Sequence, residues 1–118
     1  VRISGTEYIP PKNQQEIKSK LNEILFQQEE FTNPLEKAVY LHCNLARLQP
    51  FIDGNKRTAR MIESISLMNV GIIPVYPAKD SDILNYRKSL IAFYETENCN
   101  EYADYFLNRQ VERIKEIE

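Results

Sequence analysis

Apolar residues recur at the spacing of an α-helix in five stretches of the chain, and residues that start or stop helices bound these stretches. The clearest start is Asn33, a capping residue, which is followed by Pro34 at the first helical position. The predicted helices span residues 13–29, 34–48, 55–70, 81–95 and 99–116. Helices of this length must bury their apolar stripes against one another, which predicts a compact all-α bundle of about five helices.

The predicted helix 55–70 carries its apolar residues at helical spacing and ends before Gly71. We expect the resulting stripe to face the core; it consists of Met61, Ile62, Ile65 and Met68. The stripe of the preceding helix contains the only histidine of the chain, His42, between Leu41 and Leu45. We therefore interpret His42 as a structural histidine.

The first eleven residues differ from the rest of the chain. Apolar and polar residues alternate around Gly5, and the Pro pair at 10 and 11 cannot continue a strand. This pattern predicts a short β flap over residues 1–11, followed by a helical core over 13–116. Without a repeat or a change of composition, we expect one domain over residues 1–118, and the start at Val1 suggests a longer protein.

Composition limits the function classes. The net charge of −2 and pI near 5.5 disfavour a nucleic-acid binder, which needs a positive field. No apolar run approaches the roughly 20 residues that cross a bilayer, so we expect no membrane partner. Cys43 and Cys99 lack metal-ligand spacing and fit reduced thiols, which predicts a cytoplasmic protein.

The segment 49–60, between the second and third predicted helices, is the one that suggests chemistry. Gly54 permits a sharp turn into a helix N-terminus, where free N–H groups and the helix dipole attract anions. Lys56, Arg57 and Arg60 add three cations with the wrong sign for that dipole. An anionic ligand, most naturally phosphate, resolves the conflict. Asp53 offers a hard oxygen ligand for Mg²⁺ beside it. By spacing alone, an ordinary turn with a solvated helix face fits equally well.

The same segment resembles the signature of the Fic (filamentation induced by cAMP) family, His-Pro-Phe-x-Asp/Glu-Gly-Asn-Gly/Lys-Arg-x-x-Arg. It matches this pattern from Pro50 to Arg60. The likeness extends to the helix order, and residues 1–11 are similar to the hairpin on which the family docks target proteins. Val1, Ile3, Gly5 and Tyr8 are then the candidate docking residues.

The resemblance implies a domain that binds ATP and Mg²⁺ and transfers AMP to a hydroxyl group of a target protein. Asp53 would hold Mg²⁺, whereas Gly54 and Asn55 would form the anion pocket. Arg57 and Arg60 would bind the outer phosphates. Lys56 stands where Gly is more usual and resembles the motif of Doc, a toxin relative that acts as a kinase.

Two other motif residues are expected to be structural. Phe51 would be the buried anchor of the loop, and Pro50 its rigid corner. The family's inhibitory pattern, Ser/Thr-x-x-x-Glu-Gly/Asn, does not occur in these 118 residues, since Phe93 stands four before Glu97. An antitoxin or another inhibitory partner is therefore also compatible with the resemblance.

Gln49 departs from the pattern, because it occupies the position of the histidine that acts as general base. A glutamine amide cannot accept a proton near neutral pH. We therefore expect nucleotide binding with weak or absent AMP transfer. The open alternatives are a non-catalytic nucleotide-binding pseudoenzyme and a Doc-like toxin or kinase component.

Overall fold

The computed structural model describes residues 5–76 and 80–117. This part of the chain is helical, without strands, as the sequence predicts for the core. Its helices are α1 (Gln14–Gln27), η1 (Gln28–Glu30), α2 (Pro34–Leu48), α3 (Asn55–Met68), α4 (Asp80–Thr96) and α5 (Asn100–Ile117). The five α-helices agree with the predicted ones within a few residues, and the end of the first is a short 3₁₀ turn, η1.

Capping side chains start the first two helices. Asn13 and Asn33 each accept hydrogen bonds from two backbone N–H groups of the first turn of α1 and α2, respectively. These bonds satisfy N–H groups that have no partner inside the helix. The cap signals in the sequence therefore mark both helix starts correctly.

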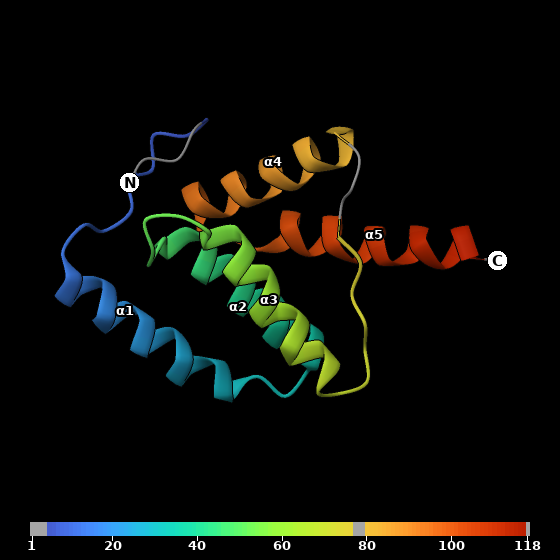
Figure 1. Ribbon diagram of the computed structural model, residues 1–118, viewed down its shortest axis with the longest axis horizontal. Helices are drawn as coiled ribbons and strands as arrows, with labels where there is room; N and C mark the ends of the chain where they lie inside the picture. The colour runs from blue at the N-terminus through green and yellow to red at the C-terminus, as the bar shows by residue number, and fades with distance from the viewer. Residues whose placement is uncertain (1–4, 77–79, 118) are drawn as a thin grey trace.

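Helix α2 lies at the centre of the molecule (Figure 1). It packs most extensively against α3 and also contacts α1, α4 and α5, whereas α4 and α5 form an antiparallel pair behind it. The predicted stripe of α2 is buried throughout and consists of Ala38, Leu41, His42, Leu45 and Leu48. From α4 and α5, the core receives large aromatic side chains, namely Tyr86, Phe93, Tyr94, Tyr102 and Phe106.

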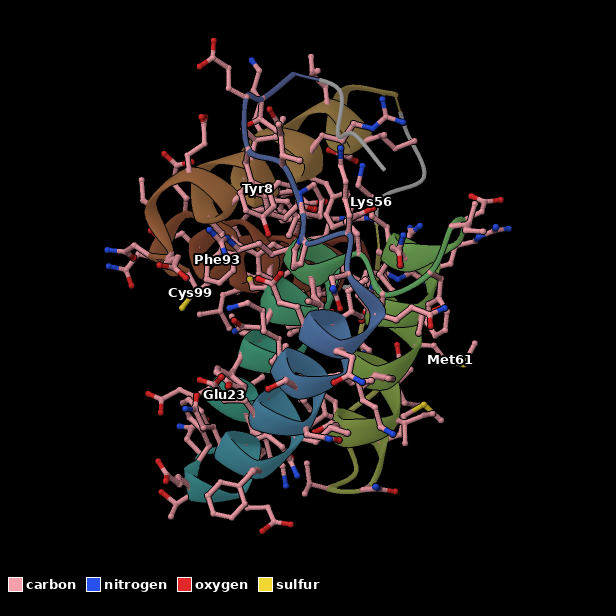
Figure 2. All side chains as sticks on the ribbon, turned by 90° about the vertical axis from the view of Figure 1, so that its left-hand side faces the viewer. Tyr8, Glu23, Lys56, Met61, Phe93 and Cys99 are labelled. Carbon is pink, nitrogen blue, oxygen red and sulfur yellow. The ribbon has the colours of Figure 1, made fainter. Side chains whose placement is uncertain are left out.

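The predicted stripe of the third helix is wrong except at Ile62, which is half-buried and packs against the core. Met61, Ile65 and Met68 are 52% to 60% exposed, and Figure 2 shows Met61 pointing away from the molecule. The buried positions of α3 are instead Asn55, Ala59, Glu63 and Leu67. This face includes two polar residues that find hydrogen-bond partners inside the protein, so apolar periodicity alone selects the other side of the helix.

The β flap is not observed in the residues that the structure describes. Residues 5–13 form a turn and an extended segment that crosses the core, and Val1 and Ile3 lie outside the described residues. Gly5 has a φ of +89°, and a Cβ atom there would lie 3.2 Å from Ile91 Cδ1 of α4. Close contact with α4, rather than strand pairing, therefore places this segment.

Two further observations complete the fold. Among the described helices, none combines the length and the apolarity that crossing a membrane requires. Cys43 is fully buried in the core, Cys99 is half-buried, and both thiols are free, as expected from the sequence.

Candidate functional site

The loop between α2 and α3 is closed by the side chain of Asn55. Its Oδ1 accepts a hydrogen bond from the Phe51 N–H (2.8 Å), and its Nδ2 donates to the Phe51 carbonyl (2.7 Å). The same Nδ2 donates to Gln49 Oε1 at 3.0 Å. These three bonds use the hydrogen-bonding groups of a side chain that is only 7% exposed. Asn55 therefore lies in the predicted site, where it fixes the shape of the loop.

Gln49, the predicted catalytic position, ends α2 in the left-handed conformation, with φ 52° and ψ 58°. Its side chain is buried. The amide Nε2 donates to the carbonyl of Ala46, and Oε1 accepts from Asn55. The amide is thus held in place from both of its polar atoms.

The expectation that Phe51 is a buried anchor is wrong, because its side chain is 51% exposed. The loop is held through the backbone of Phe51, to which Asn55 bonds at both N–H and C=O. Since hydrogen bonds orient the peptide groups, an apolar anchor is not needed, and the neighbouring Ile52 is also exposed, at 93%.

The N-terminus of α3 differs from those of α1 and α2. Gly54 occupies the cap position with a φ of +79°, so no side chain accepts bonds from the first turn, and that turn contains no acidic residue. Uncapped N–H groups at the positive end of a helix dipole favour an anion. The uncapped end of α3 therefore lies where the sequence predicts an anion site.

Asp53 and Arg57 flank this helix end and form an exposed ion pair, with 3.6 Å between Asp53 Oδ2 and Arg57 Nη2. The other oxygen, Asp53 Oδ1, accepts from the Gly54 N–H at 2.8 Å. Within residues 5–76 and 80–117, no three His, Cys, Asp or Glu side chains are grouped to hold a metal. Mg²⁺ commonly binds one carboxylate together with water and substrate phosphates. Asp53 fits such a shared site, but not a metal site built from protein groups alone.

Lys56 and Arg60 lie on the side of α3 that faces α4. The Arg60 guanidinium lies 5.5 Å from the centre of the Tyr86 ring of α4. Burial lowers the pKa of Lys56, and the nearby charges of Arg87 and Arg60 lower it further. Figure 2 shows Lys56 at the same end of the molecule as Tyr8. Lys56, Arg60 and Arg87 therefore form a group of cations, and none of them has an ion pair with a described carboxylate.

Arg87 was missed by the sequence analysis. It comes from α4, outside the motif, and nothing in its local sequence distinguishes it from the adjacent Lys88. Its proximity to Lys56 depends on how α4 packs on the core.

Tyr8, a predicted docking residue, is anchored to the core. Its hydroxyl donates to the carbonyl of Arg47 at 3.1 Å. Its ring lies under the Arg47 guanidinium (4.2 Å) and beside the ring of Tyr94 (5.9 Å between centroids). Tyr8 therefore fixes the extended segment beside the C-terminal end of α2, and Gly5, with a positive φ, lies at a turn three residues before it.

A buried polar cluster lies beneath Arg60, and it supports the structural interpretation of His42. His42 Nδ1 lies 3.0 Å from Glu63 Oε1, and His42 Nε2 lies 2.9 Å from the hydroxyl of Tyr86. Both His42 and Glu63 are fully buried. The Tyr102 hydroxyl also donates to Glu63. Glu63 was missed by the sequence analysis, because a lone Glu in a charged helix resembles a surface residue.

Comparison with known proteins agrees with this geometry. The model of the Fic/DOC family matches residues 1–67, which include the extended segment, the loop and nearly all of α3. The chain belongs to the Fic/DOC family. The family model thus covers the residues that form the helix N-terminus and its loop.

Individual Fic relatives match parts of the chain of different lengths. A protein adenylyltransferase Fic of Nematostella vectensis is 32% identical over 78 residues, which are 63% of this chain and 18% of the relative. One of Drosophila persimilis is 44% identical over 43 residues, which are 36% of this chain and 8% of the relative. Protein adenylyltransferase fic-1 of Caenorhabditis elegans is 42% identical over 43 residues, which are 36% of this chain and 8% of the relative. The chain therefore spans less than a fifth of the length of these relatives.

Proposed function

We propose that this Fic domain binds ATP together with Mg²⁺ at the N-terminus of α3, and that it transfers AMP to a target hydroxyl weakly or not at all. The observation that carries the proposal is the state of Gln49. Its amide is buried and bonded to Ala46 and Asn55 beside an anion site whose other residues match the family motif. The domain thus keeps the groups that hold a nucleotide and lacks the group that accepts a proton.

Phosphate binding is supported by the charges around the helix end. The uncapped N–H groups of α3, Lys56 and Arg60 provide donors, and Arg87 adds positive charge from α4. Asp53 is the residue suited to Mg²⁺, which would neutralise phosphate charge and orient the phosphate chain. The extended segment around Tyr8 would offer backbone groups to a target peptide near that site.

The proposed transfer requires a proton acceptor. In AMP transfer, the target hydroxyl oxygen bonds to the α-phosphorus, the bond from that phosphorus to the α–β bridging oxygen breaks, and pyrophosphate leaves. The hydroxyl proton must go to a base. A neutral amide such as that of Gln49 cannot take it at pH 7, and loss of a base typically costs about 10² to 10⁴ in rate. Phosphoryl-type transfer depends mainly on positioning and charge, so a slow reaction is compatible with this site.

The test combines calorimetry of ATP–Mg²⁺ binding with transfer of label from α-labelled ATP to proteins of a lysate. We expect the unaltered chain to bind the nucleotide, and Gln49→His to raise transfer by about 10² or more. Gln14→His is the matched control, because Gln14 lies on the exposed first turn of α1. γ-Labelled ATP in parallel reports phosphate transfer.

Three outcomes would contradict the proposal. Absence of ATP–Mg²⁺ binding would remove the nucleotide function altogether. Strong transfer of α-label by the unaltered chain would show that the base is dispensable. Label from γ-labelled ATP alone would assign phosphate transfer to the domain instead of AMP transfer.

A further inference from the structure

Arg60 is held at both its side chain and its main chain by tyrosines from outside α3. Its guanidinium lies 5.5 Å from the centre of the Tyr86 ring, a distance typical of a cation–π contact. Its carbonyl oxygen lies 3.3 Å from the hydroxyl of Tyr76, whose single proton is shared between this carbonyl and the closer Glu63 carboxylate. Tyr86 belongs to α4, and Tyr76 to the segment between α3 and α4.

Both tyrosines are attached to the same buried pair. The Tyr86 hydroxyl lies 2.9 Å from His42 Nε2, and the Tyr76 hydroxyl lies 2.5 Å from Glu63 Oε1. His42 Nδ1 and Glu63 Oε1 are in turn 3.0 Å apart. Neither His42 nor Glu63 has exposed surface. The two tyrosines that contact Arg60 are therefore anchored to fully buried groups of the core.

The hydrogen bonds of this cluster have a consistent direction. With Nδ1 of His42 donating to the Glu63 carboxylate, Nε2 can accept from the Tyr86 hydroxyl. Burial raises the pKa of Tyr86, so this hydroxyl keeps its proton at neutral pH. Tyr76 and Tyr102 complete the bonding of Glu63. Glu63 is thus hydrogen-bonded to His42, Tyr76 and Tyr102.

Arg57, the other arginine of the motif, has a different environment. Its side chain is 74% exposed and, among the residues that the structure describes, pairs only with Asp53, which is itself 91% exposed. Exposed pairs of this kind restrain a side chain weakly. The two motif arginines therefore differ in how well they are fixed before a ligand arrives.

We propose that Tyr86 and Tyr76 are positioning residues of the anion site: anchored on the buried His42–Glu63 pair, they hold Arg60 so that its guanidinium is in place for a phosphate group. The identity of the ligand rests on the proposed function, whereas the ordering of Arg60 does not. Preorganised donors bind an anion without the cost of immobilising a long side chain.

The first experiment needs no ligand. Nitrogen-15 relaxation of arginine Nε–H groups, measured near pH 6, compares Arg60 with Arg57 in the unaltered chain. We expect a rigid Arg60 and a mobile Arg57. Similar mobility of the two side chains would overturn the inference without any substitution.

Variants test the cause of the order. Tyr76→Phe removes the hydroxyl that bonds to the Arg60 carbonyl, and Tyr86→Leu removes the ring beneath the guanidinium. Each is expected to raise the mobility of the Arg60 side chain. Tyr94→Phe is the matched control, because the Tyr94 hydroxyl is buried and has no hydrogen-bond partner among the described residues. An Arg60 that stays rigid in both folded variants would contradict the proposal.

Affinity for ATP–Mg²⁺ supplies a second readout. Tyr86→Leu should weaken binding by roughly threefold to tenfold, and it should have no further effect in the Arg60→Gln background. Equal losses in both backgrounds would mean that Tyr86 acts on stability alone and would overturn the inference. A rigid Arg60 in a chain that does not bind ATP would refute the proposed function and leave the positioning role intact.

Discussion

Asn55 shows how one side chain can determine the form of a loop. The sequence and the family resemblance place it in the anion pocket, and the structure shows it bonded to both backbone groups of Phe51 and to Gln49. The sequence could predict that this position matters, since the residue follows Gly54 at a helix start. It could not predict the three bonds, which depend on how the preceding residues turn.

We predict that Asn55→Ala destabilises the domain by about 1–3 kcal/mol, because it leaves buried groups of the loop without partners. Urea unfolding followed by circular dichroism measures this change. Asn69→Ala is the control, since Asn69 is exposed at the other end of α3 and is expected to change stability by less than about 0.5 kcal/mol. Equal effects of the two substitutions would show that the loop bonds contribute little.

At the scale of the elements, the helices were predictable and the orientation of α3 was not. Caps, Pro and Gly mark the helix limits in the sequence, and α2 buries the face that its apolar stripe indicates. For α3, however, Glu63 and Asn55 are buried because His42, the tyrosines and the loop supply hydrogen-bond partners. Those partners come from distant parts of the chain, so a local pattern cannot reveal them.

Helix α4 contributes a cation that the motif does not contain. We predict that Arg87→Gln weakens ATP–Mg²⁺ binding by roughly twofold to fivefold, the effect of an exposed ion pair worth about 0.2–1 kcal/mol. Lys88→Gln removes the same charge one residue along α4, beside Asp82 and Glu112, and should leave binding unchanged. Calorimetry at low ionic strength compares them, and equal losses would indicate a general charge effect.

The stability of the whole molecule depends on tyrosines that stay protonated in the folded state. Burial raises the pKa of all seven, to about 12 for Tyr105, and Tyr86, Tyr94 and Tyr102 are at most 3% exposed. Because the folded state keeps protons that the unfolded chain releases above about pH 10, stability falls as the pH rises through that value.

We therefore predict alkaline unfolding above about pH 10. The free energy of unfolding should fall by about 1.4 kcal/mol per pH unit for each tyrosine that stays protonated in the fold. Absorbance at about 295 nm and the helical circular dichroism signal should change together. Tyr94→Phe removes one buried titrating hydroxyl and should move the midpoint upward. Tyrosine ionisation near pH 10 with the helices intact would contradict this prediction.

The two cysteines give the fold a kinetic reporter. Cys43 is inaccessible in the core, burial raises its pKa, and Cys99 is half-buried. A thiol reagent attacks an accessible thiolate, so Cys99 should react quickly and Cys43 only when α2 separates from its neighbours. In Cys99→Ser, the labelling rate of Cys43 then counts opening events, and ATP–Mg²⁺ should slow them by a factor of one plus the ratio of its free concentration to its Kd. Labelling of Cys43 as fast as that of Cys99 would mean that the centre of the bundle opens freely.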